Sequence, residues 1–184
     1  AHADETEAPP PPAPPAPPAA PAMTYEEIGV SKNRAGGLLE PYSDITRGWR
    51  ILKPSTWNQF DQIPGTYDMK WEDLVSLNYQ QIILTTSPVK STTVSVDALG
   101  PVEEVGLKLA KTRDAKLLSA KAFTKEGILF YLFDLQGPAV HQLLTLCVFK
   151  GKLWKVDASA PETRWAKTGP LYEKVAASFM PKLG

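Results

Sequence analysis

The sequence has few of the residues that mark disulfide scaffolds, and it has no long apolar run. Its 184 residues include one cysteine, Cys147, and two histidines. A single cysteine cannot form an internal disulfide, and the apolar neighbours of Cys147 predict a buried thiol. No apolar run approaches the roughly 20 residues that a membrane-spanning helix needs. We therefore expect a peripheral protein that does not span a membrane.

Net charge is also missing, because 20 Lys and Arg residues balance 20 Asp and Glu residues. Without a global field, nothing in the composition favours nucleic acid or an anionic membrane as a partner.

Enzyme motifs are equally scarce. The chain has no phosphate-binding glycine loop, no His-x-x-x-His, no pair of cysteines and no nucleophile elbow. His141 and Cys147 fall on one predicted strand and would lie about 20 Å apart, too far for a catalytic dyad. We therefore predict a protein that is not an enzyme.

The first feature that is present is a tail, residues 1–22, dominated by alanine and proline. Proline fixes φ and removes a donor, so this tail should be extended polyproline II. It could be a partner-binding arm or an inert spacer. Its opening Ala1-His2-Ala3-Asp4 is compatible with a signal-peptidase cut, so we expect a mature or trimmed chain. Residues 23–47 form an N-terminal arm, and residues 48–184 form the predicted domain.

Within that domain, strand patterns dominate. The near-continuous apolar runs 128–135 and 143–149 predict strands covered on both faces. The alternation over 152–156 predicts a partner strand for the second run, joined to it by a turn at Lys150-Gly151. Further strands are predicted at 49–53, 69–74, 81–86, 92–96 and 115–123.

Two helices complete the prediction. Gly100-Pro101 should start the first, because proline suits the first turn of a helix. The second should begin near Pro170, after a turn at 162–167, because proline cannot continue a helix from upstream. The expected fold class is α+β: an α/β/α sandwich with a central antiparallel sheet of about six strands.

Several short motifs resemble the PsbP family of lumenal photosynthetic proteins from about Pro41 to the end. They are Gly48 to Trp57, Leu99 to Glu103, His141-Gln142-Leu143, Lys150 to Trp154, Glu162 to Trp165 and Val175 to Phe179. The resemblance implies the same α/β/α sandwich. The arm before Pro41 does not match the family's N-terminal arm, and Gly169-Pro170 departs from its pattern.

The resemblance implies a non-catalytic extrinsic subunit of photosystem II in the chloroplast thylakoid lumen. There it would stabilise the oxygen-evolving complex and help retain calcium and chloride, with the photosystem core and other extrinsic subunits as partners. The alternative within the family is an assembly or stability factor for photosystem I, photosystem II or the NDH complex. Two alternative interpretations outside photosynthesis are a small-ligand enzyme on the same sandwich and a nuclear Ran-binding factor of related fold.

Two sets of site residues follow from the resemblance. His141 and Glu162 stand at positions associated with divalent metal binding, so manganese, zinc or calcium is the expected ion. Lys150 and Lys152, at the tip of the predicted hairpin, are the expected docking residues for an acidic photosystem surface. Arg164 and Lys167 would join them if the following loop folds back beside the tip.

Overall fold

The fold was examined in a computed structural model that describes residues 10–11, 22–25, 27–28, 38–74 and 80–184. Its centre is a seven-stranded antiparallel sheet with the order β4-β5-β6-β10-β9-β8-β7. These strands are β4 (Asn58–Phe60), β5 (Met69–Glu72), β6 (Gln81–Pro88), β7 (Lys116–Lys125), β8 (Ile128–Gln136), β9 (Val140–Phe149) and β10 (Lys152–Pro161). A second sheet contains β1 (Met23–Thr24), β2 (Leu38–Asp44) and β3 (Trp49–Pro54).

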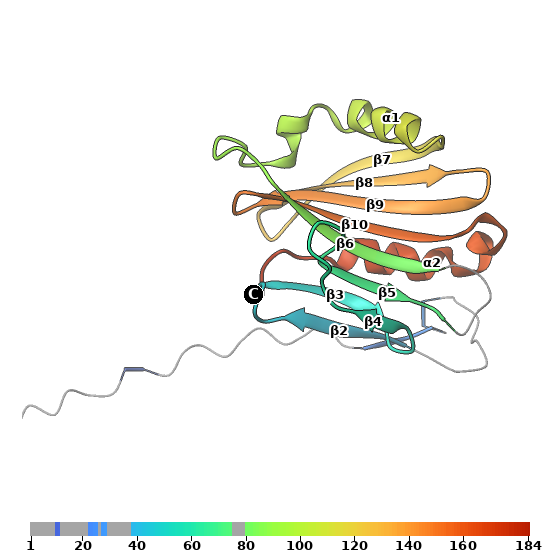
Figure 1. The fold of residues 1–184 in the computed structure, drawn as a ribbon, viewed down its shortest axis with the longest axis horizontal. Helices are drawn as coiled ribbons and strands as arrows, with labels where there is room; N and C mark the ends of the chain where they lie inside the picture. The colour runs from blue at the N-terminus through green and yellow to red at the C-terminus, as the bar shows by residue number, and fades with distance from the viewer. Residues whose placement is uncertain (1–9, 12–21, 26, 29–37, 75–79) are drawn as a thin grey trace, which may run out of the picture.

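Helices lie on both faces of the large sheet (Figure 1). The 3-10 turn η1 (Val96–Leu99) leads into α1 (Val102–Thr112), which packs on β7 and β8. Helix α2 (Glu162–Ser178) packs on β9 and β10 and also contacts β3 of the small sheet. The predicted α/β/α sandwich is confirmed, with seven central strands where about six were expected.

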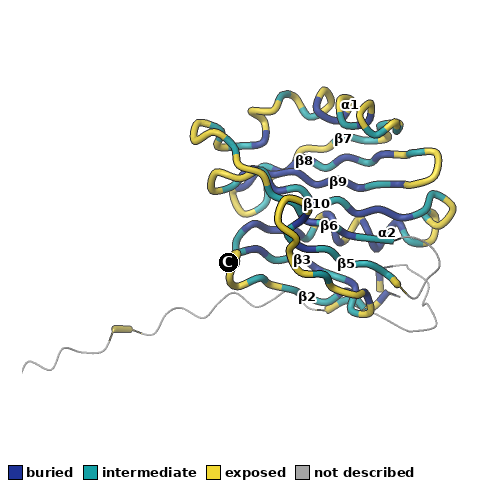
Figure 2. Tube along the Cα trace, in the orientation of Figure 1, coloured by how far each residue is buried: buried dark blue, intermediate teal, exposed yellow. Residues whose placement is uncertain are grey.

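Strands β9 and β10 form the middle of the sheet. Their turn places Lys150 at φ 48° and Gly151 at φ 75°, the left-handed backbone that a two-residue hairpin turn requires. Leu143 and Cys147 of β9 belong to the core that contains α2, whereas Leu144 belongs to the core under α1. The predicted strand with both faces covered is therefore confirmed (Figure 2).

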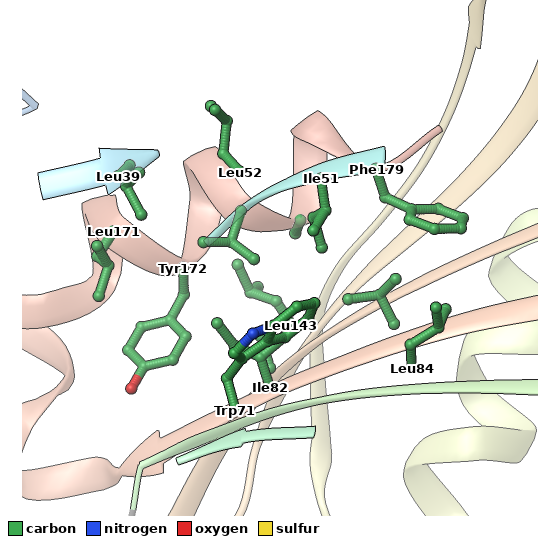
Figure 3. Close-up of a cluster of buried hydrophobic side chains, with 14 of the residues drawn as sticks. Leu39, Ile51, Leu52, Trp71, Ile82, Leu84, Leu143, Leu171, Tyr172 and Phe179 are labelled. Atoms are coloured by element: carbon green, nitrogen blue, oxygen red, sulfur yellow. The ribbon is translucent and has the colours of Figure 1, made fainter. Parts of the chain in front are cut away.

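The larger core lies between the large sheet, α2 and the small sheet (Figure 3). Trp49 and Trp71 are fully buried and meet edge to face with ring centroids 6.0 Å apart. Tyr172 and Phe179 enter the same core from the C-terminal segment. Burial of such large rings dominates core energetics, so this cluster holds both sheets and α2 together.

Helix α2 differs from the prediction. It runs without interruption from Glu162 to Ser178 and contains Pro170, where a turn at 162–167 and a later start were expected. A proline inside a helix loses one backbone hydrogen bond and clashes with the carbonyl four residues earlier. It also clashes with the Cβ of the preceding residue, and here that residue is Gly169, which has no Cβ. An ideal Cβ on Gly169 would lie 3.3 Å from Trp165 Nε1, so the indole covers this glycine. The missing Cβ therefore removes one of the costs of a proline inside this helix.

The strand predicted at 92–96 is also wrong. This segment forms a turn, with Thr93 N donating to Lys90 O at 2.9 Å, and then enters η1. The alternation does not mark a buried face, because the side chain of Val94 is 81% exposed. Among the described residues, no strand of either sheet pairs with this segment.

The predicted tail, residues 1–22, lies outside the described residues except at positions 10, 11 and 22. In the described part of the arm, Tyr25 and Ile28 are buried in the larger core. Strand β2 pairs with β3, so the expected boundary at residue 48 falls between two paired strands.

Candidate functional site

His141 is the centre of a small polar cluster at one end of the sheet. It lies at the start of β9 and its side chain is only 2% exposed. Nδ1 lies 2.8 Å from Glu162 Oε2, at the first residue of α2. Nε2 is hydrogen-bonded to Asp134 Oδ1 on β8. The structure therefore brings the predicted pair, His141 and Glu162, into direct contact.

Asp134 is the member of this cluster that sequence reasoning missed. It is the single charged residue of the apolar strand β8, between Phe133 and Leu135. Gln136 pairs with His141 across the hairpin, so Asp134 lies diagonal to His141 on the same face. A lone carboxylate in an apolar strand, read together with the hairpin register, could have identified it.

The cluster is built from local backbone contacts. Glu162 N donates to Ala139 O at 2.9 Å, which places the start of α2 against the loop before β9. Gln136 Nε2 donates to the second carboxylate oxygen, Oε1 of Glu162, at 3.2 Å. Both oxygens of Glu162 are thereby occupied.

Aromatic rings close the other side of the imidazole. The ring of Trp165 stacks on His141 with centroids 3.8 Å apart and planes at 11°. Tyr172, about two turns further along the same face of α2, stacks on Trp165 with ring centroids 5.3 Å apart. The aromatic cover excludes water from one face of His141 and strengthens its polar bonds.

The bonding pattern has an electrostatic consequence. Each nitrogen of a neutral imidazole is either a donor or an acceptor, whereas both are donors in the imidazolium. With both carboxyls ionised, the bonds to Asp134 and Glu162 form together only when both nitrogens of His141 carry protons. The cluster then has two carboxylates around one cation, each carboxylate being 27% exposed.

This geometry bears on the expected metal ion. A zinc ion held by a His nitrogen and a carboxylate oxygen lies about 2.0 Å from each, which sets the two ligand atoms more than 3 Å apart. The 2.8 Å separation of Nδ1 and Oε2 is instead that of a direct hydrogen bond. Among the described residues, no group of three or more His, Cys, Asp or Glu could hold a metal ion. The residues as arranged do not fit a shared ion, so a metal here stays a prediction that requires this bond to open.

The predicted docking residues fall into two groups. Lys150 and Lys152 are exposed at the β9–β10 tip, and their ammonium groups lie over the rings of Phe149 and Trp154 at 5.4 and 5.7 Å. Arg164 and Lys167 are exposed in the first turns of α2, beyond the far end of β10.

The two groups do not form one patch. Strand β10 has 10 residues, so its ends lie about 30 Å apart at ~3.3 Å per residue. The condition for Arg164 and Lys167 to join the tip is not met, because β10 continues to Pro161 and α2 starts at Glu162.

Another lysine lies close to the tip. Val89 N donates to Gly151 O at 3.0 Å, which places the exposed Lys90 beside the hairpin turn. Within the part of the chain that the structure describes, Lys90, Lys150 and Lys152 make no ion pair. We call these three residues the tip lysines. The sequence did not indicate Lys90, since it is 60 positions away from Lys150.

The predicted burial of Cys147 is confirmed, and its thiol is not reactive. The residue is fully buried in β9, and burial raises the pKa of its thiol to about 12. The thiolate, which is the nucleophilic form, is therefore scarce at neutral pH.

The fold and the polar cluster define a class: a compact antiparallel α/β/α sandwich with a bonded histidine between β8, β9 and α2. Comparison with known proteins identifies the family within this class. The sequence model of the PsbP family matches residues 37–180. The chain therefore belongs to the PsbP family, and it is a photosystem-associated PsbP-domain protein.

Individual relatives agree with this assignment. CyanoP from Synechocystis sp. PCC 6803 is 31% identical over 157 residues, which cover 77% of this chain and 82% of CyanoP. CyanoP from Thermosynechococcus vestitus is 27% identical over 158 residues, with 77% and 85% covered. The solution structure of cyanobacterial PsbP (CyanoP) from Synechocystis matches with a TM-score of 0.65 at 26% identity, over 77% of this chain and 91% of that one.

Proposed function

We propose that this protein is a non-catalytic extrinsic subunit of photosystem II on the lumenal side of the thylakoid membrane. In this role it stabilises the oxygen-evolving complex and its retention of calcium and chloride. Membership of the PsbP family over residues 37–180 is the observation that carries the proposal. Among the described residues, no helix combines the length and apolar character needed to cross a membrane. Attachment is therefore proposed to be peripheral, through contacts with the photosystem core and other extrinsic subunits.

The tip lysines are the proposed docking residues. Three exposed cations without an ion pair in the described chain suit an acidic partner surface. Arg164 and Lys167 form a second candidate contact at the opposite end of β10. A partner that contacts both groups of basic residues must therefore extend along the whole length of β10.

Reconstitution tests this function directly. Photosystem II membranes stripped of extrinsic proteins are mixed with the purified protein, and oxygen evolution is measured at low calcium and chloride. Rebinding that lowers the calcium and chloride requirement supports the proposal. Rebinding without any change in the calcium and chloride requirement would exclude a role of this protein in ion retention.

The alternative is an assembly or stability factor for photosystem I, photosystem II or the NDH complex. The burial of Tyr25 and Ile28 in the core favours it, because these arm residues are not available to an outside partner. Affinity isolation from thylakoids distinguishes the two functions. An assembly factor is recovered with incomplete complexes, whereas an extrinsic subunit is recovered with oxygen-evolving ones.

A further inference from the structure

A polar cleft lies on the same sheet face as α1, in the part of that face that α1 does not cover. Strand β6 pairs with β5 only as far as Leu84, opposite Met69, so Thr85 to Pro88 extend beyond the start of β5. The loop before β5 lies beside this extension and encloses a cleft of about 400 Å³ with β6 and β10. Helix α1 packs on β7 and β8, which form the opposite edge of the sheet.

The wall of the cleft is held in one arrangement by hydrogen bonds. Asp68 Oδ2 accepts from the backbone N and from Oγ1 of Thr86, at 2.7 and 2.9 Å. Arg47 donates to Asp68 O at 3.1 Å and to Gln62 Oε1 at 2.6 Å. The loop is thus fixed to β6 and to the β2–β3 turn before any ligand arrives, which reduces the entropic cost of binding.

The carboxylate of the cleft is occupied, whereas its ammonium group and three of its hydroxyls are free. The carboxylate of Asp68 accepts from Thr86 and, at 3.4 Å, from Gln62 Nε2. By contrast, the side chains of Thr66, Thr85, Ser87 and Lys155 line the cleft with no hydrogen bond or ion pair to the described residues. Lys155 lies directly opposite Thr85 in the β10–β6 register.

We propose that this cleft binds a carboxylate of a partner polypeptide, with Lys155 as its ion partner. The hydroxyls of Thr85, Ser87 and Thr66 line the same cleft and supply further donors. A carboxylate suits the cleft better than a phosphate dianion, because one cation faces the ligand and the negative charge of Asp68 lies in the same wall. This site is separate from the proposed docking of the tip lysines and does not depend on it.

Titration of the full-length, ¹⁵N-labelled protein with short peptides tests the proposal by NMR. Acetyl-Gly-Asp-Gly-amide carries only a side-chain carboxylate, and acetyl-Gly-Gly-Gly with a free C-terminus carries only a terminal one. We expect at least one of them to give saturable shifts at the amides of Thr66, Thr85 and Ser87. The peptide that binds identifies the source of the carboxylate. Neutral acetyl-Gly-Asn-Gly-amide should give no saturable shift.

Variants locate the interaction. Lys155→Gln should weaken binding by about tenfold or more, since a charged hydrogen bond is lost. Lys116→Gln, on the edge strand β7 at the opposite side of the sheet, is the control and should leave binding unchanged. If Lys155→Gln loses the dispersed spectrum of the folded protein, Ser87→Ala on the exposed end of the cleft replaces it and should also weaken binding. The proposal is overturned if neither carboxylate peptide gives saturable shifts, or if the neutral peptide binds equally well. It is likewise overturned if inorganic phosphate binds more tightly than both peptides, or if the cleft variants leave the affinity unchanged.

Discussion

At the scale of single residues, His141 shows how a polar side chain is stabilised inside this fold. Its imidazole is buried, and each nitrogen faces a carboxylate, on Asp134 and on Glu162. Removing one partner leaves the other group buried without its bond, and that penalty is usually larger than the net gain from the bond itself.

Asp134→Ala should therefore lower the free energy of unfolding by about 1–3 kcal/mol, because Nε2 of His141 loses its acceptor. Guanidinium unfolding followed by tryptophan fluorescence measures the change. Asp61→Ala, at an exposed loop position, is the matched control and should change stability by less than about 0.5 kcal/mol. Equal losses in the two variants would show that the His141 cluster adds nothing to stability.

Metal binding at the same cluster is tested by titrating manganese, zinc or calcium into the wild type and into His141→Ala. An ion bound by His141 and Glu162 must open the Nδ1–Oε2 bond, so it should bind the wild type more tightly than the variant. Isothermal titration calorimetry measures both affinities. If the affinities are equal, or if no ion binds, the histidine and the glutamate have a structural role only.

Cys147 predicts a pH effect with a definite sign. Burial raises the pKa of its thiol from the ordinary value of 9.0 to about 12 in the folded protein. The folded state therefore keeps a proton that the unfolded state loses, so stability is fully present below pH 9 and falls as pH rises toward 12. Above pH 9, the unfolding free energy of Cys147→Ala should therefore fall less steeply with pH than that of the wild type. Rapid labelling of native Cys147 by a thiol reagent at pH 8 would contradict this burial.

At the scale of elements, β9 is a strand that is covered on both faces. Its alternate residues enter two different cores, one with α2 and one with α1. A strand covered on both faces carries a near-continuous run of apolar residues, which is why the segment 143–149 does not alternate.

Leu144→Ala should cost about 2–5 kcal/mol, since a fully buried side chain is replaced by a cavity beneath α1. Thermal and denaturant unfolding measure the loss. Leu107→Ala on the outer face of α1 is the control, because that leucine is 60% exposed and should contribute little. A loss below half a kcal/mol at Leu144 would place β9 at an exposed edge, against the structure.

At the scale of the whole molecule, charge is balanced overall but not locally. The equal numbers of acidic and basic residues leave no net charge, yet the tip lysines gather cations at one end of the sheet. Electrostatic docking therefore depends on a local patch, which salt screens within about 10 Å at 0.1 M ionic strength.

Lys150→Glu combined with Lys152→Glu should weaken binding to photosystem II membranes and reduce its salt dependence, with the fold intact. Cosedimentation at several ionic strengths measures the effect. Lys116→Glu with Lys121→Glu makes the same charge change on the edge strand β7 and should bind normally. Arg164→Glu with Lys167→Glu reports separately on the other end of β10. Binding that ignores salt and all three charge reversals would exclude these lysines as the anchor.

Much of the fold could be predicted from the sequence because its signals are local. The apolar run 143–149, the Lys150-Gly151 turn and the Gly100-Pro101 helix start each depend on neighbouring residues, and each appears in the structure. The interruption expected at Pro170 was wrong because the cost of a helical proline depends on Gly169 and on packing by Trp165. The strand expected at 92–96 was wrong because a strand needs a partner as well as an alternating pattern.

The sequence by itself determined the class of fold and the buried cysteine, and its resemblance to the PsbP family named His141 and Glu162 as one candidate site. Only the tertiary structure added Asp134 to His141 and Lys90 to the tip lysines, and separated Arg164 and Lys167 from that tip. The physical reason is that propensity and periodicity act over a few residues. By contrast, the neighbours of a side chain are set by strand order and register, which join positions far apart in the chain.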